Sequence, residues 1–194
     1  MLIEKLKNYN IVLGSASPRR KELLAELELE FSIRTTDKEE DYPKDLEINE
    51  IAKFLAKQKA NIIARDIEKD YLLITADTIV VQNSEVINKP KNKQDAIEIL
   101  RKLSGNSHKV ITGICITSSE KQIVFSSITN VFFTNLSDEE ICFYIEKCKP
   151  FDKAGSYGIQ DWIGFIGIER IIGSYNNVVG LPTAVLYQKL KLFI

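Results

Sequence analysis

Asp77 is the residue whose position points most directly to chemistry. Residues 71–81 are otherwise almost entirely apolar, as is typical of a buried strand. A carboxylate in such a strand must be ion-paired, hydrogen-bonded or bound to a metal ion, because an unpaired buried charge is costly. The plain alternative is an aspartate that completes a turn where the strand ends. The pattern marks Asp77 as a candidate catalytic or metal-binding residue.

Lys59 breaks a second apolar pattern. Small and apolar side chains recur at helical spacing from Ala52 to Ile63, and Lys59 falls in the same row. A lysine on the inner face of a helix either extends to water or points into a site that holds anions. Lys89, which precedes Pro90, is a weaker candidate of the same kind, because most loop lysines are simply solvated.

The chain from residue 11 to residue 20 has the pattern of an anion site. A short apolar run ends at Gly14, and Ser17 followed by Pro18 fits the N-cap and first position of a helix. The start of a helix offers free backbone N–H groups and a partial positive charge, which suit phosphate. A well-capped surface helix with solvated arginines explains the same residues equally well. The side chains that could bind an anion here are Ser15, Ser17, Arg19 and Arg20.

Residues 152–160 mix glycines with polar side chains, as backbone that approaches a ligand would, although an ordinary loop has the same composition. Other familiar sites are absent from the sequence, which has no P-loop, no dinucleotide fingerprint after a strand and no Cys-x-x-Cys motif. His108 is the only histidine, which argues against a Ser-His-Asp hydrolase and against a histidine-rich metal site. We therefore interpret Ser15 and Ser17 as hydrogen-bond donors to phosphate rather than as nucleophiles.

The bulk composition limits the class of protein. Of the 194 residues, 44% are hydrophobic, which is enough for one sizeable core or for two small lobes that share one. A net charge of −1 argues against a broad nucleic-acid or anionic-membrane surface. The sequence shows neither a signal peptide nor an apolar run of roughly 18 residues, and its three cysteines lack paired spacing. We therefore expect a cytoplasmic protein with reduced thiols and with no membrane or nucleic-acid partner.

The elements that must position these residues alternate between strands and helices. Strands are predicted at 11–14, 31–35, 71–81 with an interruption at Asp77-Thr78, 85–88 after a tight Asn83-Ser84 turn, and 108–118 and 122–134 as an antiparallel pair. Helices are predicted from Pro18, from an Asn49 cap to about 65, from an Asn92 cap to 103, from a Ser137 capping box to about 147, and over 182–192. Residues 36–46, 152–161 and 173–182 are predicted loops. This order predicts one α/β domain over residues 1–194, with a mixed sheet and flanking helices.

Several of these segments, taken in order, resemble the signatures of the Maf family of nucleoside triphosphate pyrophosphatases. The resemblance covers residues 11–182, and several ordered motifs together are far more specific than any one of them. It favours phosphate binding over a plain capped helix. The matching motifs are Ser15-Ala16-Ser17-Pro18-Arg19-Arg20, Ala76-Asp77-Thr78, Lys89-Pro90, Asp152-Lys153-Ala154-Gly155-Ser156-Tyr157-Gly158-Ile159-Gln160, Gly173-Ser174-Tyr175 and Val178-Val179-Gly180-Leu181-Pro182.

The resemblance implies an elongated α/β fold related to inosine triphosphate pyrophosphatases, with two lobes around a cleft. It implies hydrolysis between the α and β phosphates, which releases a nucleoside monophosphate and pyrophosphate and uses a divalent metal cation, Mg²⁺ or Mn²⁺. It also implies a general-base role for Asp77, metal binding by Asp77 and Glu40, and a homodimer as one assembly. By matching position, the resemblance further implies that phosphate is bound by Ser15, Arg20, Lys59 and Lys89.

Three positions separate the branches of this family, one of which resembles dTTP and UTP pyrophosphatases and another of which prefers 7-methylguanosine triphosphate. Here they read Arg19, Thr78 and Gln160. The methylguanosine branch carries an aromatic residue, Gln and Glu, and a glutamate suits a cationic methylated purine. A neutral Gln160 instead offers a donor and an acceptor that match the O4 and N3–H edge of uracil or thymine. We therefore predict dTTP and UTP as substrates, with modified pyrimidine nucleotides as additional ones.

Two other functions stay open beside this one: a 7-methyl-GTP pyrophosphatase and a non-catalytic nucleotide-binding regulator of cell division. The regulator is disfavoured because a pure binder has no need of a buried carboxylate beside phosphates. An RNA-binding module is disfavoured by the net charge of −1 and by the lack of a basic-aromatic stripe. The chain also departs from the common family pattern at Asn88 and at Asp161-Trp162, where glycine is frequent.

Overall fold

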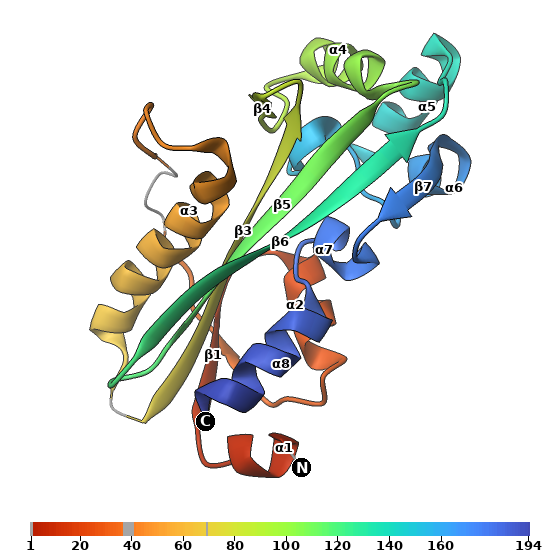
Figure 1. The fold of residues 1–194 in the computed structure, drawn as a ribbon. Coiled ribbons are helices and arrows are strands. Elements are labelled where there is room, and N and C mark those ends of the chain that lie inside the picture. The colour runs from red at the N-terminus through yellow and green to blue at the C-terminus, as the bar shows by residue number, and fades with distance from the viewer. Residues whose placement is uncertain (1, 37–40, 69) are drawn as a thin grey trace. The chain divides into compact units, whose positions relative to one another are not determined.

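The computed structural model describes residues 2–36, 41–68 and 70–194, which form helices around one mixed sheet (Figure 1). The described strands are β1 (Asn10–Gly14), β2 (Ser32–Ile33), β3 (Tyr71–Gln82), β4 (Glu85–Ile87), β5 (Ser107–Thr117), β6 (Gln122–Phe133) and β7 (Ile168–Ile172). These seven strands pair in the order β2-β1-β3-β5-β6-β7, and β4 pairs with β3. β1 is parallel to both β2 and β3, whereas β4 and β7 pair antiparallel with their neighbours. The predicted α/β class with a mixed sheet is therefore confirmed.

The chain divides into two compact units. The first comprises Met1–Asp77, Thr112–Ser127 and Gly180–Ile194, and the second comprises Thr78–Ile111 and Ile128–Val179. The first unit contains the helices α1 (Leu2–Leu6), α2 (Pro18–Ala25), α3 (Ile48–Ile63), the 3₁₀ turn η1 (Ala64–Asp66) and α8 (Thr183–Phe193). The second contains α4 (Lys93–Leu103), α5 (Asp138–Cys148), the 3₁₀ turn η2 (Ala154–Ser156), α6 (Trp162–Gly167) and α7 (Tyr175–Val179).

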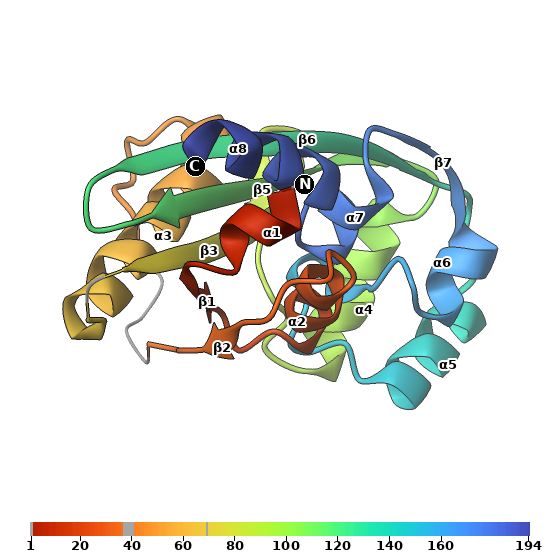
Figure 2. The ribbon, with the colours of Figure 1, turned by 90° about the horizontal axis from the view of Figure 1, so that it is seen from below.

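The core of the first unit lies on both faces of its strands. On one face, α1 and α8 lie side by side (Figure 2), and Leu6, Leu186 and Leu190 are fully buried in one cluster with Leu72 of β3. Burial of leucine and isoleucine side chains of this size contributes about 1.5–3 kcal/mol each. α8 is thereby fixed by apolar contacts, although its N-terminus has no side-chain cap.

On the other face, α3 approaches the sheet at van der Waals distance. A Cβ atom on Gly113 of β5 would lie 2.2 Å from the backbone carbonyl oxygen of Ala52, so only glycine fits there. The Thr75 hydroxyl donates to the Ala56 carbonyl at 2.7 Å and fixes the helix along β3. Small side chains on the inner row of α3 are what permit this close packing, and Lys59 lies on the same helix one turn beyond Ala56.

The second unit encloses the single histidine. His108 is 3% exposed, its Nε2 lies 2.7 Å from the Tyr157 hydroxyl, and its ring packs against Phe133. Burial lowers the pKa of His108 to about 4, so the ring is neutral near pH 7. This histidine therefore packs in the interior of the second unit.

Helix capping is predicted well wherever a side chain makes the cap. Asn92 Oδ1 accepts the Asp95 N–H at 2.9 Å, and Ser137 forms the predicted capping box at the start of α5. The Asn83-Ser84 turn is also confirmed, because both residues have positive φ angles (49° and 61°), as a tight hairpin turn requires.

Four expectations about elements are wrong. α3 begins at Ile48, with Glu47 at the N-cap position and no side-chain hydrogen bond, so Asn49 does not cap it. β3 continues without interruption through Asp77 and Thr78, because a partner from α3 compensates the carboxylate. The predicted loop 173–182 contains α7, and the predicted loop 152–161 contains η2. α1 was not expected at all, since five residues are too few to show a helical period.

Two further findings bear on the class of protein. None of the helices in the described residues is long and apolar enough to cross a membrane. The three cysteines, Cys115, Cys142 and Cys148, are all free, as their spacing predicts.

Candidate functional site

The connection between β1 and α2 forms a capped helix start. Ser17 is the N-cap of α2 and its hydroxyl oxygen accepts the Arg20 N–H at 3.5 Å, while Pro18 occupies the first position of the helix. Ser15 Oγ accepts a hydrogen bond from the Ser17 N–H at 3.3 Å. The helix is eight residues long and has no acidic side chain in its first turn to compete for its N-terminal charge.

Arg20 is held in place by two of its own N–H groups. Its Nε donates to the Gly180 carbonyl at 2.9 Å, and its Nη1 donates to Ser15 Oγ at 3.2 Å. Ser15 Oγ thus accepts from both Ser17 and Arg20, and a hydroxyl with two acceptor positions in use still has its proton to donate. A fixed guanidinium beside a hydroxyl donor is an arrangement suited to phosphate oxygens.

Asp77 is compensated by Lys59, as its place in an apolar strand requires. Lys59 Nζ lies 2.5 Å from Asp77 Oδ1, and the two side chains are only 15% and 7% exposed. The plain alternative of a turn at a strand end does not apply, because β3 runs on to Gln82.

Asp77 and Ser15, one member of each pair, lie on or directly after the neighbouring parallel strands β3 and β1. Gly14, the last residue of β1, lies opposite Thr75 in β3. Ser15 therefore follows the carboxyl end of β1 at the level of the β3 residues that lead into Asp77. Ligands of open α/β sheets characteristically bind at the carboxyl ends of such strands. The first unit thus brings together a carboxylate, a lysine, an arginine and a hydroxyl.

The other predicted residues of the first unit are placed as follows. Arg19 lies in the first turn of α2 and is partly buried. Glu40 lies outside the described residues. Among residues 2–36, 41–68 and 70–194, no three His, Cys, Asp or Glu side chains gather closely enough to hold a metal ion. A single carboxylate, Asp77, nevertheless fits Mg²⁺ that arrives with a triphosphate, because Mg²⁺ takes one or two carboxylates and completes its shell with phosphate oxygens and water.

The second unit holds the remaining predicted residues. Thr78 follows Asp77 in β3 and is partly buried. Lys89 is exposed and lines a cavity of about 520 Å³ between β4 and α4, together with Lys91 and Lys102. Gln160 lies in the segment between η2 and α6, and its Oε1 atom is buried with no hydrogen-bond partner among the described residues. A buried amide oxygen without a partner is rare in folded proteins and suits a ligand donor.

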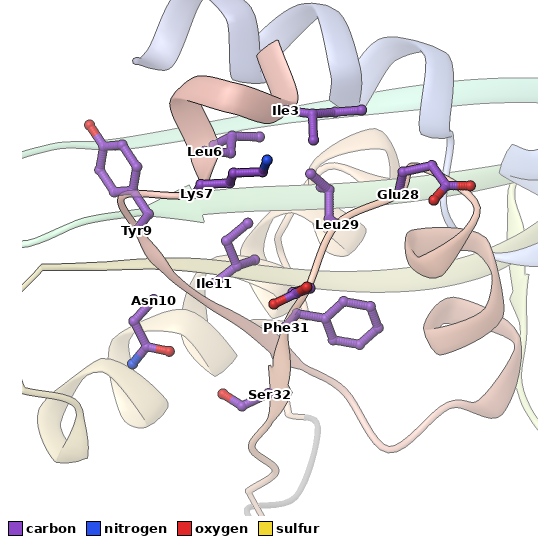
Figure 3. Close-up of a pocket in the computed structure, with 11 residues that line it drawn as sticks. Ile3, Leu6, Lys7, Tyr9, Asn10, Ile11, Glu28, Leu29, Phe31 and Ser32 are labelled. Carbon is purple, nitrogen blue, oxygen red and sulfur yellow. The ribbon is translucent and has the colours of Figure 1, made fainter. Parts of the chain in front are cut away.

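A further cavity of about 570 Å³ lies in the first unit, close to the N-terminus (Figure 3). The close-up shows Leu6 and Lys7 at one side and Leu29 and Phe31 at another. No predicted site residue lines it, so the candidate site and this cavity are separate features of the described chain.

Sequence reasoning missed the residues that hold the site residues in place. The Gly180 carbonyl orients Arg20, and the Thr75 hydroxyl ties α3 to β3. A contact made by a backbone carbonyl cannot be recognised from the sequence, because every residue type has this group. Thr75 carried a weak signal, since it is a polar residue in an apolar strand two positions before Asp77.

Comparisons with known proteins place this arrangement in a family. The family described as Maf-like protein matches residues 10–193. A dTTP/UTP pyrophosphatase of Flavobacterium johnsoniae is 45% identical over 194 residues and covers 100% of both chains. A dTTP/UTP pyrophosphatase of Phocaeicola vulgatus is 51% identical over 191 residues, which are 98% of this chain and 99% of that protein. Among solved structures, the Staphylococcus aureus Ham1 protein shares the fold, with a TM-score of 0.50 at 15% identity over 93% of this chain and 99% of the other.

Proposed function

Because the chain belongs to the Maf family, we propose that it hydrolyses dTTP and UTP to the nucleoside monophosphate and pyrophosphate. The observation that carries this proposal is the buried ion pair between Lys59 of α3 and Asp77 of β3, the strand that pairs with β1. The substrates come from the names of full-length relatives at 45–51% identity.

Phosphate binding is proposed for cationic and hydroxyl side chains. Ser15 and Arg20 would bind phosphate oxygens at the start of α2, where backbone N–H groups add to their effect. Lys59 and Lys89 would neutralise further phosphate charge. A triphosphate carries about four negative charges, and the transition state of phosphoryl transfer spreads charge over its oxygens, so fixed cations lower the barrier.

Asp77 is proposed as the general base. Its carboxylate would take a proton from water while the water oxygen forms a bond to the α-phosphorus. The bond between that phosphorus and the bridging oxygen then breaks, and pyrophosphate leaves with the bridging oxygen. Lys59 Nζ lies 2.5 Å from this carboxylate and compensates its charge inside the apolar strand. A divalent cation held by Asp77, with Glu40 as a second proposed ligand, would supply charge neutralisation at the phosphates.

We assign recognition of the nucleobase of the substrate to Arg19, Thr78 and Gln160. The carbonyl oxygen of Gln160 suits the N3–H of uracil or thymine, because it is buried and has no partner among the described residues. Cytosine presents an unprotonated nitrogen at that position and would leave the oxygen unsatisfied.

A panel of nucleoside triphosphates assayed for pyrophosphate release tests this function. We expect fast release from dTTP and UTP, slow release from CTP and 7-methyl-GTP, and loss of activity when EDTA removes divalent cations. Faster release from 7-methyl-GTP than from dTTP and UTP would contradict the substrate assignment. Tight binding of nucleotides without turnover would instead support a regulator.

We also propose a cytoplasmic homodimer. Phe165 of α6 is 82% exposed and Ile172 of β7 is 52% exposed, and burial of such side chains between two copies of the chain would stabilise a dimer. Light scattering after size-exclusion chromatography would give a mass near twice 22.1 kDa if the dimer forms, and near 22.1 kDa if it does not.

A further inference from the structure

The Tyr144 hydroxyl joins both ends of the turn that carries Gln160. Tyr144 lies on α5 and is fully buried. Its hydroxyl donates to Asp161 Oδ2 at 2.7 Å and accepts the Gly158 N–H at 3.0 Å. Burial, reinforced by the hydrogen bond to Asp161, raises the pKa of Tyr144 well above its usual range, so the hydroxyl keeps its proton and remains a donor.

The turn itself has little freedom to move. The Asp161 N–H donates to the Gly158 carbonyl at 3.0 Å, which closes residues 158–161 into a β-turn. A Cβ atom on Gly158 would lie 2.6 Å from Asp161 Oδ2, so the two ends of the turn are in direct contact. The Asp161 carbonyl accepts the Gly164 N–H at 2.8 Å, which ties the turn to α6.

Gln160 is the residue this turn presents. Its Oε1 is buried and finds no hydrogen-bond partner in the described chain. Tyr144, Gly158 and Asp161, in contrast, are hydrogen-bonded to one another, and Asp161 Oδ2 also lies 3.8 Å from Lys153 Nζ. A network that satisfies its own members and leaves one acceptor open holds that acceptor ready for a ligand donor.

We propose that Tyr144 is a positioning residue for nucleobase selection: through Asp161 and Gly158 it holds the Gln160 carbonyl where the N3–H of a uracil or thymine base is read. This inference rests on the proposed function. Tyr144 does not touch the phosphates in this account, so its effect falls on the choice between bases and leaves the hydrolytic step alone.

The test is the ratio of kcat/KM for UTP to kcat/KM for CTP. In Tyr144→Phe the ring stays and only the hydroxyl is lost, so we expect kcat/KM for UTP to fall about tenfold through KM, with the value for CTP nearly unchanged. Asp161→Ala removes the hydroxyl's partner and should lower the ratio similarly. Asp161→Asn keeps an acceptor for the hydroxyl and should retain most of the ratio.

Tyr71→Phe is the matched control, because Tyr71 is a buried tyrosine of the first unit whose hydroxyl makes a 3.4 Å bond to the Ser118 carbonyl. It should leave the ratio unchanged. A Tyr144→Phe protein that melts like the wild type and keeps the wild-type ratio would overturn the inference. If Tyr144→Phe does not fold, an unchanged ratio in Asp161→Ala would overturn it equally. Wild-type protein that releases no pyrophosphate from UTP or dTTP would contradict the proposed function itself, and the inference falls with it.

Discussion

Lys59 Nζ of α3 lies 2.5 Å from Asp77 Oδ1 of β3, and both side chains are largely withdrawn from solvent. A buried carboxylate is costly without a partner, and a buried ammonium equally so. In the absence of substrate, each charge therefore compensates the cost of burying the other. Under the proposed function, a bound triphosphate would offer the lysine a second set of oxygens, and the same pair would then serve both stability and phosphate binding.

Removing the lysine alone should destabilise the fold. In Lys59→Met the Asp77 carboxylate stays buried without its ammonium, and we expect the free energy of unfolding in urea to fall by about 2–4 kcal/mol. The double variant Lys59→Met/Asp77→Asn should recover most of that loss, because no charge is then left unpaired. Lys57→Met, at an exposed position on the same helix, is the control and should change stability by less than about 0.5 kcal/mol. Additive effects of the two single changes would show that the pair contributes no coupling.

Arg20→Lys should lower activity while leaving the fold intact. Lysine keeps the positive charge but replaces the rigid planar guanidinium, whose Nε and Nη1 donate to the Gly180 carbonyl and to Ser15 Oγ, by a single ammonium on a flexible stem. We expect kcat/KM to fall about 10- to 100-fold for dTTP and UTP alike, because the phosphates are common to both. Arg65→Lys, an exposed arginine in η1, is the matched control. Equal activity of Arg20→Lys and wild type would remove Arg20 from the phosphate site.

Gly113→Ala should move α3 away from the sheet. The added Cβ would meet the Ala52 backbone at 2.2 Å, and backbone cannot yield as a side chain does. We expect a loss of about 1–3 kcal/mol in unfolding free energy, together with a drop in kcat because α3 carries Lys59. Gly167→Ala is the control, because its Cβ would meet only the ends of Leu136 and Phe133 side chains, at 3.0 Å or more. Equal melting temperatures for the two variants would contradict this view of the helix packing.

The sequence predicts those parts of the molecule in which local chemistry decides the structure. Ser17, Asn92 and Ser137 cap helices because a short polar side chain satisfies the first free N–H groups of the same segment. The chain turns at Asn83 and Ser84, because both residues adopt positive φ angles there. The burial of Asp77 and its need for a partner also follow from sequence, because both depend only on its apolar neighbours along the strand.

Features that depend on distant contacts could not be predicted. The identity of the Asp77 partner depends on where α3 lies against β3, and that is set by the Gly113 contact with Ala52. α7 forms inside a stretch rich in turn-forming residues because Asn177, fully buried, donates its amide to the Val110 carbonyl at 3.0 Å. The role of the Tyr144 hydroxyl could not be predicted either, because residue type and spacing do not identify the hydrogen-bond partners of a side chain.

His108 should make stability depend on pH between about 4 and 6.5. Its pKa is about 4 in the folded protein and 6.5 when unfolded, so the unfolded state binds more protons in this window. Stability is therefore fully present above pH 6.5 and falls as the pH drops towards 4, by about 3 kcal/mol in total. Glutamine keeps a donor for Tyr157 but does not titrate, so in His108→Gln the fall of the unfolding free energy between pH 6.5 and 4 should lose the contribution of this residue. Urea titrations at several pH values measure it, and an identical slope in the two proteins would contradict the prediction.

The role of Asp77 is tested most directly by pyrophosphate release from dTTP and UTP by Asp77→Asn, measured beside nucleotide binding by the same protein. Asparagine keeps the size and the hydrogen-bonding oxygen but cannot take a proton, so we predict a loss of about 10²–10⁴-fold in kcat with binding retained. Asp70→Asn, an exposed change just before β3, should keep full activity. If Asp77→Asn released pyrophosphate at the wild-type rate, Asp77 would be no general base and the proposed mechanism would be wrong.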